Sequence, residues 1–305
     1  MIYEHRTEFA GLPIASPEPD TSLHGEAAWV LSLEFEATEA FDELVAGFVA
    51  LPGSDRVRAL VIGNWDHEYS MDQSSEEVVR SLAASAGQLP ELRALFLGDV
   101  IREEMEISWI RQSDITPLLE AFPALERLEI RGGVDLELRP VTHPSLQVLR
   151  MESGGLPGPV VAAISRSELP ALTRLELWLG TEQYGGNAGV ADLAGILSGA
   201  GLPALTHLGL QDSEIQDEIA AAVASAPIVA RLETLDLSMG ALSDEGAEAL
   251  LAGQPLTHLR GLNLSHHFLT DAMMERVRGA LPGVEVDLGD RQKPDGERFY
   301  IAVSE

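Results

Sequence analysis

A short apolar pattern, L-x-x-L-x-[LI], returns along most of this chain. Its alternating leucines suit a strand that buries one face, because successive side chains of a strand point to opposite sides. One such unit cannot bury its apolar face alone, so several units must stack side by side. Eight copies align, the first being the most degenerate: Val57–Ile62, Leu92–Leu97, Leu125–Ile130, Leu146–Met151, Leu172–Leu177, Leu205–Leu210, Leu232–Leu237 and Leu259–Leu264.

The spacing of the copies leaves room for a helix after each strand. The steps from Leu205 to Leu232 and from Leu232 to Leu259 are 27 residues each. The segments that follow the last three strands align without gaps, and their apolar residues recur about two helical turns apart. Ser243 and Thr270 are good N-cap residues, which predicts where two of these helices begin. The aligned segments are Gln211–Pro227, Ser238–Pro255 and Ser265–Pro282.

These repeats resemble leucine-rich repeats of the ribonuclease-inhibitor type. The shared pattern is L-x-x-L-x-L, a buried Leu five residues later and then [ST]-D-E-G-A-x-x-L, over roughly residues 55–290 and most strongly over 205–282. Asp212, Met239 and His266 depart from it, because Asn or Cys normally closes the turn there, so we expect the turn backbone to be satisfied differently. The repeats predict an α/β fold: a leucine-rich-repeat solenoid (horseshoe) with a parallel sheet on the concave face and helices on the convex face.

The whole chain also resembles a family of stand-alone actinobacterial leucine-rich-repeat proteins. Members of that family tend to be encoded near radical-chemistry and ligase-like enzymes. The resemblance therefore implies a supporting role beside an enzyme encoded nearby. Three segments carry it: Phe96–Asp114, Leu175–Gly186 and Gly209–Ala224.

The residues outside the repeats are expected to cover the open ends of the solenoid. Residues 1–25 are loop-like, the alternation in Ala27–Glu36 predicts a strand, and Ala37–Gly53 reads as a helix. Residues 1–54 are thus an N-terminal segment with a capping strand and helix. Residues 55–290 form the solenoid, and residues 291–305 form either a loose tail or a closing strand, at Phe299–Glu305.

Composition narrows the class of partner. The formal net charge of −29 repels nucleic acid and anionic lipid. It either keeps a long solenoid soluble, the interpretation we prefer, or steers the chain toward a basic partner. The sequence has no cysteine, no long apolar run and no signal-peptide pattern at its start. We therefore expect a cytoplasmic protein without disulfides or membrane spans, and we expect no cofactor. Lys293 is the only lysine, and this bias toward Arg, with abundant Ala, Gly and Leu, is typical of a bacterial genome of high GC content.

Polar residues on the concave face form columns, because equivalent positions of neighbouring strands stack about 4.8 Å apart. Arg150 is predicted to lie between Glu129 and Glu176, and Arg131 beside Glu152. The columns are either a self-neutralising ladder or a polar floor that offers Arg to a ligand carboxylate or phosphate. The column after the centre runs through Arg131, Glu152, Trp178 and Gln211.

Three repeats are longer than 27 residues, and their extra residues are expected after the strands, in Asn64–Ser75, Gly98–Asp114 and Trp178–Gly189. These loops hold three of the four Trp and two of the four Tyr, and such rings anchor many interfaces. Alternatively the rings fold the loops down as local cores, and Trp109 is then the ring most expected to be buried, because Ile107 and Ile110 flank it. The predicted partner site comprises Trp65, Tyr69, Asp99, Arg131, Arg150, Glu152, Trp178, Tyr184 and Gln211.

Motifs for catalysis are weak. The chain has no G-x-S-x-G, and its glycine-rich turns lack the spacing of phosphate-binding loops. One alternative is an enzyme or enzyme subunit with a metal-dependent acidic site around Asp99–Glu106, which requires three or more carboxylates to converge on one point. The sequence favours a non-catalytic scaffold or adaptor that binds a protein or peptide with the concave face and one loop edge.

Overall fold

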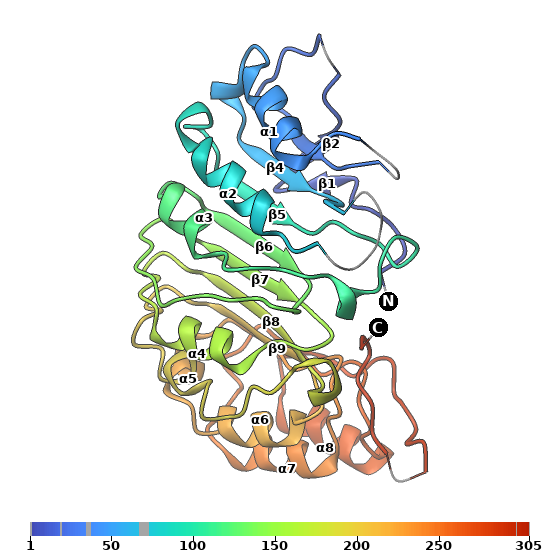
Figure 1. Cartoon of the computed structure of the whole chain (residues 1–305). Helices are drawn as coiled ribbons and strands as arrows, with labels where there is room; N and C mark the ends of the chain where they lie inside the picture. The colour runs from blue at the N-terminus through green and yellow to red at the C-terminus, as the bar shows by residue number, and fades with distance from the viewer. Residues whose placement is uncertain (1, 19, 35–37, 67–72, 297, 305) are drawn as a thin grey trace.

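The computed structural model describes residues 2–18, 20–34, 38–66, 73–296 and 298–304. Within these ranges the strands form one open sheet whose neighbours follow chain order (Figure 1). β1 pairs antiparallel with β2, and the later pairs are parallel. The strands are β1 (Glu8–Phe9), β2 (Leu12–Ala15), β3 (Ala28–Leu31), β4 (Ala59–Ile62), β5 (Ala94–Leu97), β6 (Arg127–Arg131), β7 (Val148–Glu152), β8 (Arg174–Gly180), β9 (His207–Ser213), β10 (Thr234–Asp236), β11 (Gly261–Asn263) and β12 (Glu285–Asp287).

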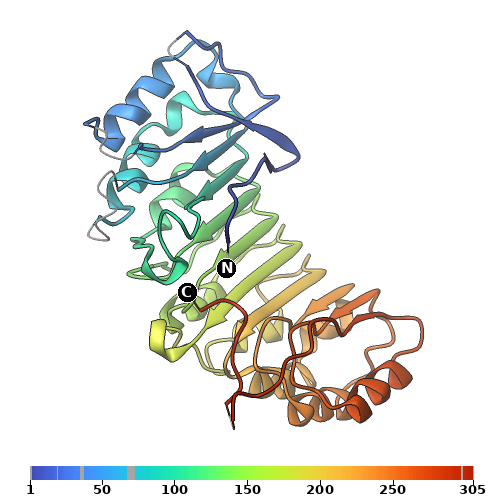
Figure 2. The same ribbon diagram turned by 90° about the vertical axis from the view of Figure 1, so that its right-hand side faces the viewer.

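The eight predicted repeats supply β4 to β11, in the predicted register. Leu208 of β9 is aligned with Leu235 of β10, which is aligned with Leu262 of β11, and all three are buried. Helices cover the convex side of the sheet, as predicted (Figures 1 and 2). They are α1 (Phe41–Ala50), α2 (Glu76–Ala84), α3 (Thr116–Ala121), α4 (Gly158–Arg166), α5 (Ala194–Ser198), α6 (Gln216–Val223), α7 (Asp244–Ala252) and α8 (Asp271–Ala280).

Side-chain caps join the last helices to one another. The predicted N-caps are confirmed: the Ser243 hydroxyl accepts from the amide of Glu245, and the Thr270 hydroxyl accepts from that of Met273. The aligned aspartates do more than favour the helix dipole. Asp217 accepts the Ser243 amide at 2.8 Å, and Asp244 accepts the Thr270 amide at the same distance, so each helix start is tied to the next repeat.

The shortest repeat interrupts the helix layer. The step from Leu125 to Leu146 is 21 residues, and the connection 132–147 between β6 and β7 contains no helix. Isolated parallel bridges join it instead to the preceding loop, at Arg111 with Val134 and at Asp114 with Glu137. The convex side of this repeat therefore has loop backbone in the place where the repeats on either side have α3 and α4.

The expectation of loop-like residues 1–25 is wrong for residues 8–15. A hairpin, β1–β2, turns at Ala10 and Gly11, whose φ angles of 52° and 74° fit a tight primed turn. Its Phe9 packs on Phe96 in a small second core on the concave side. The physical reason is that the first repeats are apolar on both faces, so their concave face also needs cover. That core consists of Phe9, Ala28, Ala59, Val61, Ala94 and Phe96.

The C-terminal residues run back across the ends of the strands without forming a strand of their own. Their backbone reaches the three residues that replace the usual Asn or Cys, each of which has a positive φ between 54° and 69°. Asp212 accepts the Val303 amide at 2.9 Å, the Met239 carbonyl accepts the Ala302 amide at 2.8 Å, and His266 lies 3.1 Å from the Tyr300 carbonyl. Hydrogen bonds with the backbone of this tail thus take part in closing the turns, where Asn or Cys is usual. It brings the C-terminus close to the N-terminus (Figure 2).

Candidate functional site

The polar floor lies on the concave side of β6, β7 and β8. The predicted alignment of Glu129, Arg150 and Glu176 is confirmed. Arg150 pairs with Glu176, its Nη1 lying 3.3 Å from Oε2, but its Nε turns to Glu152 at 2.8 Å and not to Glu129. Glu129 is instead paired with Arg127 at 2.8 Å. The ladder therefore runs partly along the strands as well as across them.

The guanidinium of Arg131 is buried and bonded to neighbouring residues of the protein. It is 3% exposed, its Nε lies 2.8 Å from Glu152, and its Nη1 donates to the Val100 carbonyl at 2.9 Å. Its Nη1 also lies 3.4 Å from Asp99, a buried carboxylate. These contacts favour the self-neutralising ladder at Arg131 over an Arg that is offered to a ligand. Arg150 keeps 30% of its side chain exposed.

A residue that the sequence did not single out completes the floor. Arg6, from the N-terminal segment, places Nη1 2.7 Å from Glu129 and Nη2 3.1 Å from Glu152. Its guanidinium carbon lies 4.3 Å above the centre of the Phe96 ring, an arrangement typical of a cation–π contact. No periodic pattern points to Arg6, because it lies outside the repeats and reaches them through the fold.

Two carboxylates of the floor, Glu152 and Glu176, are held in their charged form. Burial alone would raise the pKa of Glu152, but Arg131, Arg150 and Arg6 lower it below its ordinary value. Burial likewise opposes the shift at Glu176, where a hydrogen bond from His207 and the charge of Arg150 lower the pKa to about 2. The floor is thus a fixed array of negative groups matched by guanidinium groups.

The inserted loops follow their strands as predicted, but the aromatic rings in them are not arranged as expected. Trp65 and Trp178 are 5% and 7% exposed, so neither is an open anchor. Trp109 was the ring most expected to be buried if the loops formed local cores, and it is 48% exposed. Ile107 and Ile110 turn inward around the short 3-10 helix η3 (Ile107–Trp109), which leaves Trp109 on the outside. Tyr69 lies outside the described residues.

Trp178 forms the centre of a small cluster that includes both ends of the chain. Ile107 and Val303 pack with it as buried neighbours, and Ile2 joins them from the N-terminal side. Its ring also lies 5.5 Å from the Arg150 guanidinium carbon. The column position after Trp178 is Gln211, which is buried and donates to Ser238 at 3.4 Å.

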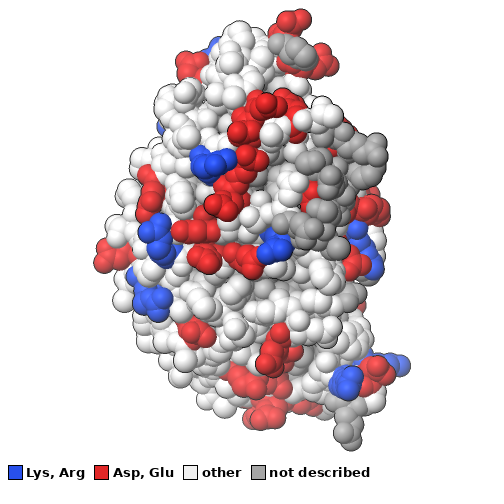
Figure 3. Space-filling view, viewed as in Figure 1, with Lys and Arg blue, Asp and Glu red and all other residues white. Residues whose placement is uncertain are grey.

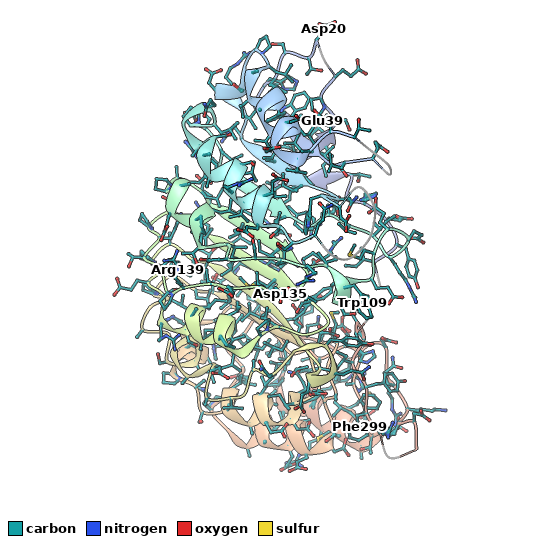
Figure 4. All side chains as sticks on the ribbon, viewed as in Figure 1. Asp20, Glu39, Trp109, Asp135, Arg139 and Phe299 are labelled. Atoms are coloured by element: carbon teal, nitrogen blue, oxygen red, sulfur yellow. The ribbon has the colours of Figure 1, made fainter. Side chains whose placement is uncertain are left out.

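A hollow of about 790 Å³ opens at the edge where the strands end. Trp109 and Tyr184 line it, together with Arg111 and Asp135, whose side chains form an ion pair with Nε 2.9 Å from Oδ2. The same ion pair borders a second hollow of about 630 Å³ beside α2 and α3. Figure 4 shows Trp109 and Asp135 on this side, and Figure 3 shows that acidic groups outnumber basic ones on the same face.

Close backbone packing holds the Tyr184 loop against the end of β7. A Cβ placed on Gly155 would lie 2.2 Å from the Tyr184 carbonyl oxygen, a distance that no side chain can occupy. Gly155 also forms an antiparallel bridge with Gly180 at the end of β8. The short 3-10 helix η4 (Glu182–Tyr184) is therefore fixed on the rim of the hollow.

Two acidic residues of the loop after β5 share the His5 ring, which lies 3.5 Å from Asp99 and 3.3 Å from Glu104, and each also has a partner of its own. Asp99 is buried against Arg131, Glu104 accepts the Ile101 amide at 3.0 Å, and Glu106 lies 3.3 Å from Arg102. In the part of the chain that the structure describes, no group of three His, Asp or Glu side chains is arranged to hold a metal ion. The convergence that the enzyme alternative requires is not seen at Asp99–Glu106.

Asp212, which accepts the Val303 amide of the C-terminal tail, has a raised pKa. Burial raises its pKa to about 8, although the amides of Val303 and Ala302 donate to it and act in the opposite direction.

Among the described residues, no helix is both long and apolar enough to cross a bilayer.

Comparisons with known proteins agree with this architecture. A family model described as Leucine Rich repeat matches residues 232–251, which include β10 and most of α7. A protein of Bacteroides fragilis, whose crystal structure comes from the Northeast Structural Genomics Consortium, is 31% identical with a TM-score of 0.78, over 86% of this chain and 73% of that one. An internalin of Listeria monocytogenes is 16% identical with a TM-score of 0.46, over 88% of this chain and 68% of that one. No curated protein matches. The chain belongs to the leucine-rich-repeat proteins.

Proposed function

We propose that this protein is a non-catalytic scaffold that binds a protein or peptide partner at the edge where the strands end. Solenoids present extended surfaces to partners, and inserted loops on one edge often carry the contact. The observation that carries the proposal is Trp109, a large ring that is about half exposed on the rim of a hollow of about 790 Å³. Trp and Tyr at the rim of a pocket are the usual anchors of an interface.

The proposed site keeps part of the set predicted from the sequence and adds to it. Tyr184 lines the hollow with Trp109, and the Arg111–Asp135 pair supplies polar groups to its lining. Trp65, Trp178 and Gln211 are buried, and the buried Asp99, Arg131 and Glu152 belong to the neighbouring floor. Arg150 is the member of that floor with part of its guanidinium open to solvent.

The chemistry of the surface suggests the chemistry of the partner. The net charge of −29 favours association with a basic surface, and the hollow suits an apolar side chain beside an Arg or Lys. The resemblance to the stand-alone actinobacterial family would make that partner an enzyme encoded nearby, in the cytoplasm of a bacterium. This protein would then hold or position the enzyme and carry out no reaction itself.

The test begins by identifying the partner with a pull-down from the native cytoplasm and mass spectrometry. Its affinity is then measured for the parent, for Trp109→Ala and for Phe299→Ala. Phe299 is a matched control because it is 44% exposed but lies on the tail and outside the hollow. Trp109→Ala should weaken binding by about 2 kcal/mol or more, roughly 30-fold, with Phe299→Ala unchanged. If Trp109→Ala binds like the parent, the edge is not the recognition surface.

A further inference from the structure

Three buried carboxylates meet on the concave side near the ends of β5, β6 and β7. Asp99, Glu129 and Glu152 are 3%, 2% and 3% exposed. Among their described partners, Arg131 is buried to the same degree and serves two of them, at 2.8 Å from Glu152 and 3.4 Å from Asp99. Removing one partner from a buried ion pair leaves an uncompensated charge at high cost. Arg127 and Arg150 contact Glu129 and Glu152 at 2.8 Å, but both are about one-third exposed, and Arg6 adds a further guanidinium from outside the sheet.

Arg6 supplies that guanidinium in the way a bound ligand would. One nitrogen contacts Glu129 at 2.7 Å, another contacts Glu152 at 3.1 Å, and the plane lies over Phe96 with 4.3 Å between the guanidinium carbon and the ring centre. Two carboxylates and an aromatic ring fit the flat, forked shape of arginine and do not fit the compact ammonium of lysine equally well. The geometry selects for arginine.

The segment that carries Arg6 is mostly exposed and lies outside the sheet. Residues 3–5 and 7 are exposed, and Ile2 and Arg6 are the half-buried members of the stretch 2–7. Its polar contacts reach the loop after β5: the Ile2 carbonyl accepts the Arg102 amide at 2.9 Å, the Arg6 amide donates to Asp99 at 3.3 Å, and the His5 ring lies 3.3 Å from Glu104. The hairpin that follows is paired in the sheet, whereas residues 2–6 are not. Displacing residues 2–6 would break these polar contacts and leave the pairing of β1 and β2 intact.

We propose that Glu129, Glu152 and Phe96 form a binding site for the arginine side chain of an extended segment, and that Arg6 is an exchangeable occupant of this site. A partner segment with an arginine takes the place of Arg6 and lies across the concave floor. The site is on the concave face and does not depend on the hollow at Trp109, so it stands without the proposed function. The acidic net charge of the chain assists the approach of such a segment.

The experiment uses the full chain and a labelled peptide that copies residues 2–9, with the affinity followed by fluorescence anisotropy. Arg6→Ala in the protein empties the site, so the peptide should bind this variant at least tenfold more tightly than it binds the parent. The matched control peptide has Ala in place of its arginine and should lose that binding. Adding Glu152→Gln to the Arg6→Ala protein should also abolish it.

A second variant keeps the test decisive if Arg6→Ala does not fold. Ile2→Ala removes the other half-buried contact of the stretch and leaves all three carboxylates and Arg6 in place. The peptide should bind it more tightly than the parent, and binding should weaken with added salt. The proposal is overturned if the peptide binds neither folded variant, or if the arginine peptide and the alanine peptide bind alike. Circular dichroism establishes which variants are folded.

Discussion

At the scale of single residues, Asp212 makes the tail contact sensitive to pH. It occupies the turn position where leucine-rich repeats usually have Asn, so this chain has a carboxyl group where an amide is usual. Its pKa rises from an ordinary value of 3.8 to about 8 through burial. A folded pKa above the unfolded one means that the folded chain binds a proton that the unfolded chain releases. Stability should therefore be full below about pH 4 and fall as the pH rises toward 8.

We predict that Asp212→Asn removes this dependence. Asn tolerates the positive φ of 54° at this position, and its carbonyl can still accept the Val303 amide. At pH 9 the variant should be more stable than the parent by about 1–3 kcal/mol, the usual penalty for an uncompensated buried polar group, with a smaller gain at pH 5. Urea denaturation at several pH values measures this. An unchanged pH profile would mean that Asp212 does not carry the effect.

Two tryptophans provide a second residue-scale prediction, because their burial is the reverse of the order expected from sequence. Trp178→Ala should cost about 3–5 kcal/mol of unfolding free energy, since it leaves a cavity among Ile107, Val303 and Ile2. Trp109→Ala should change stability by less than about 0.5 kcal/mol, because the ring is largely in solvent. Chemical denaturation of both variants decides. Similar losses at the two sites would contradict the described packing.

At the scale of elements, the strands and caps of the repeats were predictable and the two terminal segments were not. The repeat pattern fixes β4 to β11, because each Leu has an equivalent in the next repeat. The sequence does contain an indication of the hairpin. Val61 and Phe96 make the concave face of the first repeats apolar, and an apolar face must be covered by another segment. The contacts of Arg6 and of the tail join residues far apart in sequence, so no local pattern contains them.

We predict that deleting the tail, residues 299–305, opens the Trp178 cluster. Ile301 and Val303 are buried in the folded chain, so their loss exposes apolar surface and the indole. Tryptophan fluorescence should shift to the red. The pH dependence attributed to Asp212 should disappear as well, because the acid is then solvated. Phe299→Ala alone, which leaves these contacts intact, serves as the control. A deletion variant with parental fluorescence would show that the tail does not cover Trp178.

At the scale of the whole molecule, the fold follows from repetition, whereas the candidate sites follow from its interruptions. The hollow at Trp109 adjoins the one repeat connection, 132–147, that contains no helix. The arginine site exists because the N-terminal segment crosses the concave face. The sequence placed the inserted loops after their strands and predicted the columns of the concave face, since both follow from the strand register. It could not show which rings are buried, because that depends on how each inserted loop folds back.

The last prediction concerns how a change in one repeat spreads through the solenoid. Leu208 of β9 is fully buried and aligned with Leu175 on one side and Leu235 on the other. Leu208→Ala should cost about 2–5 kcal/mol in chemical denaturation, because the cavity lies at the centre of a repeat. Val286→Ala in β12 is the matched control. It should cost under about 1 kcal/mol, because Val286 is only half-buried in the final strand. Since each repeat interacts with its neighbours alone, Leu208→Ala should also speed amide exchange most in β8, β9 and β10. A cost below 1 kcal/mol, or faster exchange spread evenly over the sheet, would mean that the repeats do not support one another in this register.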